Sequence, residues 1–193
     1  CQPLLLVSSF KQIVYTKSMV YPNLVFKINL GLDAEMAYGF LDRKSAGVDF
    51  GAGIIKLHPE LKKAKRLSGL ERRKYIGKFT QDYYKEHSKI LKESLNKTQS
   101  DWNKVKNKFF KAVENIFGSY PWPNGDYMHF LSIYNCNPRF LENKTFQVFY
   151  KHPQGINSVI AHEMLHFIFY DYFENKEKDF YLQIGKGGAW LVI

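Results

Sequence analysis

The chain has 193 residues, 45% of them apolar, and a formal net charge of +10. This size and composition suit a folded globular protein with one sizeable core. They exclude a membrane-spanning protein, because no run approaches the roughly 18 apolar residues of a span. Leu4 to Val7 is too short for a signal-peptide core, and Cys1 and Cys136 alone make no disulfide framework, so a reducing, cytoplasmic compartment is expected.

The positive charge is concentrated in one segment. Between Lys56 and Lys111 there are 17 basic and 6 acidic residues, a net of +11, which leaves the rest of the chain at −1. Such a segment can bind nucleic acid or another polyanion. Lysine-rich solvated helix faces are common, however, so nucleic-acid binding is not expected.

Residues 1–66 form a part that we expect to be rich in strands. Leu24 to Leu32 is β-branched and apolar and predicts a strand. Asp33 is then suited to cap a short helix that runs to Leu41. Gly47 to Leu57, with apolar residues among three glycines, predicts a second strand with a bend or bulge.

Residues 67–118 predict a basic helical hairpin. Ser68 and Glu71 have the spacing of a capping box, and apolar residues recur at helical spacing as far as Leu95. We expect a break at residues 96–100. The second helix then carries a stripe made of Trp102, Val105, Phe109, Val113 and Ile116, and it ends at Gly118.

Residues 119–193 predict a pair of strands followed by a helix. Pro121 to Gly125 is a firm break, after which Tyr127 to Tyr134 and Thr145 to Lys151 have the period of strands. One of these strands is expected to be the sheet edge that pairs with an extended peptide. Asn157 or Ser158 is suited to cap the final helix, which we expect to end near Phe173.

The stretch from Val159 to Ile168 contains residue types that packing alone does not explain. His162 and His166 are four residues apart, so on a helix their imidazoles lie on one face and can bind one metal ion. Glu163 lies between them, and a carboxylate beside a bound zinc ion can take a proton from the water that the metal activates. A chance match has a frequency on the order of one in a hundred, and apolar flanks favour a buried helix.

This stretch resembles the active-site helix of the zincin metallopeptidases. The resemblance implies a single α+β domain over residues 1–193 in which an antiparallel or mixed sheet packs on the motif helix. It also implies a Zn²⁺ cofactor, a peptide or protein substrate, and Glu163 as the catalytic base. Metzincins have glycine and histidine where this chain has Phe169 and Tyr172, so the likeness is to gluzincins.

Catalytic zinc needs a third protein ligand, and the sequence does not assign one. No histidine follows His166 and no acid follows Asp179. We therefore expect the ligand to lie past residue 193, in a domain that is incomplete at its C-terminus, with Glu174 or Glu177 as weaker choices. Asp171 is expected on another face of the same helix.

Three further side chains have a chemistry suited to the site. Cys136 is a ligand type that peptide deformylases combine with this helix, but a buried structural thiol is the more common role. His129 and His152, near the strand pair, could act as donors to an oxyanion. The function expected from all of this is a zinc-dependent metallopeptidase, and the alternative is a non-enzymatic binding protein of the same fold that uses the basic helices to bind a polyanion.

Overall fold

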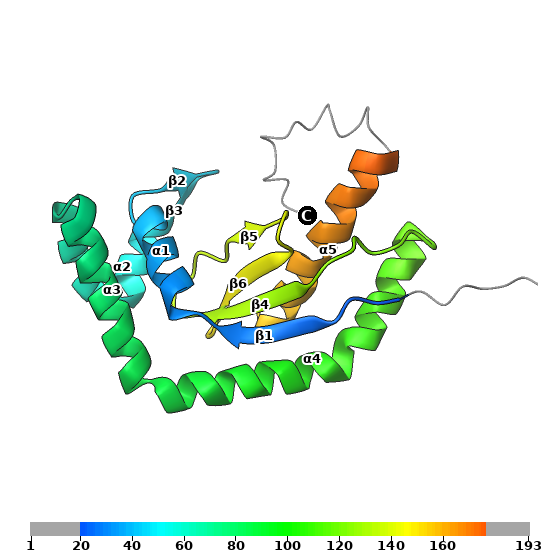
Figure 1. The fold of residues 1–193 in the computed structure, drawn as a ribbon, viewed down its shortest axis with the longest axis horizontal. Helices are drawn as coiled ribbons and strands as arrows, with labels where there is room; N and C mark the ends of the chain where they lie inside the picture. Colours follow the sequence, from blue (N-terminus) through cyan, green and yellow to red (C-terminus); the bar gives the residue numbers. More distant parts are fainter. Residues whose placement is uncertain (1–19, 177–193) are drawn as a thin grey trace, which may run out of the picture.

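A four-stranded mixed sheet lies at the centre of residues 20–176, the part of the chain that the computed structural model describes (Figure 1). Its strand order is β1 (Leu24–Ile28), β4 (Tyr127–Ser132), β6 (Thr145–Phe149) and β5 (Arg139–Phe140). The first three strands are parallel, and β5 runs antiparallel to β6. The α+β class is thus confirmed, but the prediction that β4 or β6 forms the edge is wrong, because β1 and β5 flank them.

The first part of the connection from β1 to β4, as far as Glu86, forms a helical subdomain at one end of the sheet (Figure 1). It consists of α1 (Leu30–Phe40), the short strands β2 (Lys44–Ser45) and β3 (Val48–Asp49), α2 (Phe50–Leu57), a 3₁₀ helix η1 (Pro59–Arg66) and α3 (Gly69–Glu86). Apolar side chains from these helices pack against the ends of β4 and β6 in a first core. Its wholly or almost wholly buried members include Leu41, Ile54, Leu61, Ile76, Leu91 and Ile133.

The strand predicted over Gly47 to Leu57 is wrong beyond Asp49, since α2 begins at Phe50. The carboxylate of Asp49 accepts a hydrogen bond from the backbone N of Ala52 at 2.8 Å and caps the helix. Gly51 lies so close to the backbone of Leu41 that an added Cβ would be 1.8 Å from the Leu41 carbonyl oxygen. The glycine therefore serves close packing in this helix, not a bulge in a strand.

Asp33 does not cap α1. Asn29 has that role, and its side chain accepts from Leu32 N at 3.0 Å. Asp33 lies one turn further on, is fully buried, and joins the subdomain to the sheet. Its carboxylate accepts four hydrogen bonds, from Ser132 Oγ (2.6 Å), Gln147 Nε2 (2.6 Å), Tyr84 Oη (2.7 Å) and Ile133 N (3.0 Å).

The predicted helical hairpin is wrong. The helix break falls at His87, not at residues 96–100, and α4 continues from Ser88 to Phe117. Helices α3 and α4 meet near this break and then diverge, with α4 running along the sheet (Figure 1). Residues 96–100 contain no glycine or proline to stop a helix, and Thr98 is buried. The predicted stripe also fails in part, because Val105 and Ile116 are exposed.

Helix α5 (Ile156–Lys176) packs with α4 against the sheet and encloses a second core. Trp102, Phe110, Tyr127, Phe146, Ile160 and Met164 are among its buried members. The helix starts directly after Gly155, before the predicted caps Asn157 and Ser158, and it runs past Phe173, so Glu174 lies within it. Within the described range, no helix is long and apolar enough to cross a membrane.

Candidate metal centre

Helix α5 is anchored by its apolar positions, and this anchoring determines where the motif points. Val159, Ile160, Met164 and Ile168 are buried in the second core, at the helical spacing expected of one buried face. The remaining positions turn His162 and Glu163 toward a cleft at the side of the sheet that ends in β5. The predicted helical context of the motif is therefore present.

The two motif imidazoles converge. Nε2 of His162 lies 2.9 Å from Nε2 of His166, and the two rings meet edge to face with centroids 4.5 Å apart. Two nitrogen ligands of a tetrahedral zinc ion are about 3.3 Å apart for bonds of about 2.0 Å, so a small rotation of either ring would fit both to one ion. The pair therefore fits two positions of a zinc site.

His166 is the more enclosed of the two motif histidines. It is 4% exposed, its ring stacks on Tyr170 at 5.7 Å, and its Nδ1 has no hydrogen-bond partner within the described part of the chain. Burial, and then the positive charge of Arg139, lower the pKa of His166 to about 3. The ring is therefore neutral at ordinary pH, which is the state that a metal ligand requires.

Glu163 is buried and paired with Arg139, a residue that the sequence analysis missed. Nη1 of Arg139 donates to Oε2 of Glu163 at 2.6 Å, with the two side chains 16% and 7% exposed. Burial raises the pKa of Glu163, while the Arg139 charge and hydrogen bond and then His162 oppose this shift. No local pattern identifies Arg139, since it reaches the site only through the pairing of β5 with β6.

The cleft beside the motif has a volume of about 630 Å³. His162 and Glu163 form part of its wall, and Asn137, His152 and Gln154 form another part. His152 therefore does lie near the motif, as predicted. Burial lowers the pKa of His152, which makes it a neutral imidazole near pH 7.

The other candidate residues do not join the histidine pair. His129 is fully buried between the rings of Phe26 and Phe146 and does not line the cleft, so it is not an oxyanion donor; burial also lowers its pKa to about 3. Cys136 is buried in the first core, and burial raises the pKa of its thiol to about 12. It fits the structural role.

The third ligand is not found among residues 20–176, where no group of three or more histidine, cysteine, aspartate and glutamate side chains is placed to hold a metal ion. Glu174 is two turns beyond His166 on the same helix, about 12 Å along its axis, and lines a different depression with Leu141 and Lys144. Asp171 faces away from the pair, as predicted, and accepts a hydrogen bond from Tyr120 Oη at 2.6 Å. Glu177 and Asp179 lie outside the described residues.

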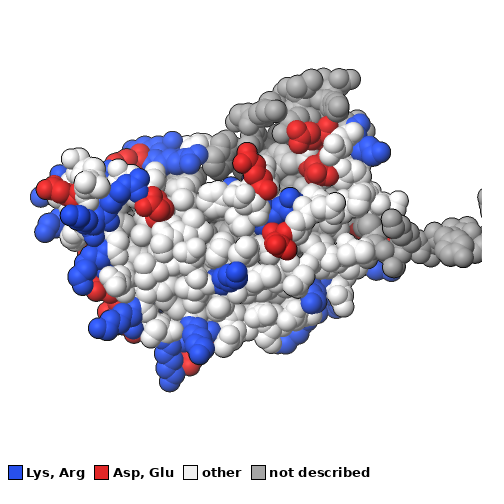
Figure 2. Space-filling model, viewed as in Figure 1, with Lys and Arg blue, Asp and Glu red and all other residues white. Residues whose placement is uncertain are grey.

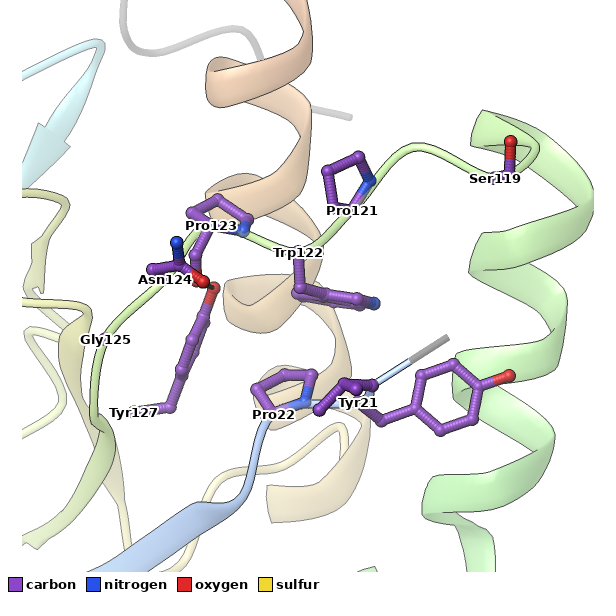
Figure 3. Close-up of a pocket in the computed structure, with 10 residues that line it drawn as sticks. Tyr21, Pro22, Ser119, Pro121, Trp122, Pro123, Asn124, Gly125 and Tyr127 are labelled. Atoms are coloured by element: carbon purple, nitrogen blue, oxygen red, sulfur yellow. Dashed lines mark hydrogen bonds between the residues drawn. The ribbon is translucent and has the colours of Figure 1, made fainter. Parts of the chain in front are cut away.

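A second cavity, of about 590 Å³, is formed where the chain enters β1 beside residues 119–127 (Figure 3). Its walls are mainly aromatic and proline side chains, with Tyr21, Pro22, Trp122 and Tyr127 around it. The hydroxyl of Tyr21 donates to Glu114 at 3.0 Å and that of Tyr127 to the Pro123 carbonyl at 2.8 Å. Both hydroxyls are therefore already hydrogen-bonded within the protein.

Comparisons of the chain with protein-family models, with curated proteins and with solved structures gave no match.

Proposed function

We propose that the protein is a zinc-dependent metallopeptidase. The observation that carries the proposal is the 2.9 Å approach of the two Nε2 atoms of His162 and His166 on α5, with Glu163 beside them at an open cleft. The pair brings two nitrogen atoms together next to a buried carboxylate, as a site for a metal ion and a general base requires. Zn²⁺, when bound, would lower the pKa of a water molecule to about 7 and polarise a peptide carbonyl.

The residues of the chain have separate roles in this proposal. His162 and His166 bind the metal as neutral imidazoles. Glu163 accepts a proton from the attacking water and passes it to the amine that leaves when the peptide bond breaks. His152, which lines the same cleft, would donate a hydrogen bond to the carbonyl oxygen as negative charge develops on it.

The position of strand β5 in the sheet favours a peptide as the substrate. It is the last strand in the sheet order, so its outer side has no strand partner within residues 20–176. Arg139, in β5, touches Glu163, which places this edge beside the motif. An extended peptide that hydrogen-bonds to the edge would present its backbone to Glu163 without demanding a particular sequence.

Two substitutions test the roles of the motif residues. Glu163→Gln keeps the shape of the side chain, so we expect zinc binding to persist while hydrolysis of labelled casein falls by about a thousandfold or more. His162→Ala removes a ligand, so we expect zinc binding to be lost. Zinc content after dialysis and the rate of casein hydrolysis are the two measurements, and loss of zinc from the Glu163→Gln variant would assign Glu163 to coordination and refute the mechanism.

A further inference from the structure

The ion pair between Arg139 and Glu163 differs from the other ion pairs of the described residues in its burial. Its two side chains are 16% and 7% exposed. At least one partner is 57% exposed or more in each of the pairs Lys44–Asp49, Lys65–Asp42, Arg72–Asp42, Arg73–Glu35, Lys78–Asp82, Lys97–Asp101 and Lys104–Asp101. A surface pair contributes little to stability, but a buried charge requires a partner. The Arg139 guanidinium is therefore the group that compensates the buried charge of Glu163.

The same guanidinium also acts on the histidine pair. Its Cζ lies 5.9 Å from the centre of the Tyr170 ring, and His166 stacks on the same ring. A positive charge held at this place repels a divalent cation bound between His162 and His166. It also fixes the carboxylate of Glu163 by a short, charge-assisted hydrogen bond.

We propose that Arg139 is a positioning residue of the metal centre, which orients the Glu163 carboxylate and at the same time weakens zinc binding by His162 and His166. The inference rests on the proposed function. It predicts that loss of the guanidinium charge changes metal affinity and hydrolysis in opposite directions. A residue that only stabilised the fold would change both in the same direction.

Two variants separate the charge from the hydrogen bond. Arg139→Gln removes the charge but keeps an N–H donor, so we expect zinc to bind about tenfold more tightly. Its kcat for casein hydrolysis should fall about tenfold, because a neutral amide holds the carboxylate less firmly. Arg139→Lys keeps the charge but replaces the planar fork by a flexible ammonium, so we expect zinc affinity within about twofold of the wild type and a similar fall in kcat.

Zinc affinity is measured by titration against a chromophoric chelator, and kcat with fluorescein-labelled casein, on the full chain. Arg66→Gln is the matched control, because it removes the same charge from the exposed end of η1. It should leave both quantities unchanged. Circular dichroism of each variant confirms that it is folded.

The outcomes distinguish the inference from the proposed function. If the wild type binds zinc and Glu163→Gln abolishes hydrolysis, but Arg139→Gln binds zinc no more tightly than the wild type, the role of Arg139 is refuted and the metallopeptidase proposal stands. Equal tightening in the Arg139→Gln and Arg139→Lys variants would also refute it, because the charge would then be irrelevant. A wild type that binds zinc no more tightly than the His162→Ala variant refutes both.

Discussion

Asp33 shows how a single residue can join two parts of a fold. Its carboxylate accepts hydrogen bonds from one residue of α3 and from two of the sheet strands, and it is fully buried without a basic partner among its hydrogen-bond donors. Four hydrogen bonds favour the ionised form, but the cost of burial is larger and raises the pKa of Asp33 from 3.8 to about 6. The ionised carboxylate is therefore held at a cost to stability.

The pKa shift of Asp33 predicts a dependence of stability on pH. Between about pH 4 and pH 6 the folded state binds more protons at Asp33 than the unfolded state, so its contribution to the free energy of unfolding falls as pH rises through this window. From pH 4 to pH 7 the loss is about 2 kcal/mol. The Asp33→Asn variant keeps the shape of the side chain but has no carboxyl group to titrate. Urea unfolding of both proteins at several pH values should show that, from pH 4 to pH 7, the free energy of unfolding of the wild type falls by about 2 kcal/mol relative to that of the variant. Parallel curves for the two proteins would contradict the assignment.

The elements show which features local sequence can predict. The spacing of His162, Glu163 and His166 within apolar flanks was sufficient to predict a helix with two converging imidazoles, because helical geometry alone determines that relation. The segment from Gly47 to Leu57 was misread, since a short apolar run with glycines suits a strand or a buried helix equally well. Most of the segment forms helix α2, which is capped by Asp49 and packs closely against Leu41, a residue outside the segment.

Helix α2 provides a test of that close contact. A Cβ at Gly51 would lie 1.8 Å from the oxygen and 2.7 Å from the carbon of the Leu41 carbonyl, and these are backbone atoms that cannot rotate away. Gly51→Ala should therefore lower the free energy of unfolding by about 3 kcal/mol or more. Gly77→Ala is the matched control, because an added Cβ in the middle of α3 meets no atom within 4 Å and should raise stability by up to about 1 kcal/mol. Similar effects of the two substitutions in thermal unfolding would show that the contact with Leu41 is not tight.

At the scale of the whole molecule, the site depends on strand pairing that no local sequence pattern predicts. Arg139 reaches Glu163 because the connection between β4 and β6 turns back to place β5 antiparallel on β6, a rearrangement without a sequence pattern of its own. The break between α3 and α4 was misplaced for a related reason, since apolar residues continue at helical spacing past His87 as far as Leu95. The α+β class, strands β1, β4 and β6 and the motif helix were thus accessible from local patterns, whereas helix α2, the sheet order and the partners of Asp33 and Glu163 depended on long-range packing.

The distribution of charge on the whole molecule bears on whether it binds nucleic acid. Basic side chains gather over the helical subdomain and along α4, while the face over β1 and β4 is mostly uncharged (Figure 2). Part of this basic charge is balanced within the structure. Arg72 pairs with Asp42 at 2.5 Å and Arg73 pairs with Glu35, both acids from outside the basic segment, and Asp101 pairs with Lys97 and with Lys104.

Because α3 and α4 diverge and part of their basic charge is paired with carboxylates, the basic residues are not gathered as unpaired charge on one helical hairpin. We therefore expect only weak, non-saturable binding of a 20-base-pair DNA duplex at physiological salt. Fluorescence anisotropy over a range of salt concentrations is the measurement. A polyanion site that neutralises about six phosphates would instead give saturable binding whose affinity falls with a logarithmic slope near −5. Lys108 is exposed on α4, and at a true polyanion site the Lys108→Gln variant should reduce the size of this slope by about one unit. Both results together would establish the basic helices as a nucleic-acid surface and would favour the alternative of a non-enzymatic binding protein.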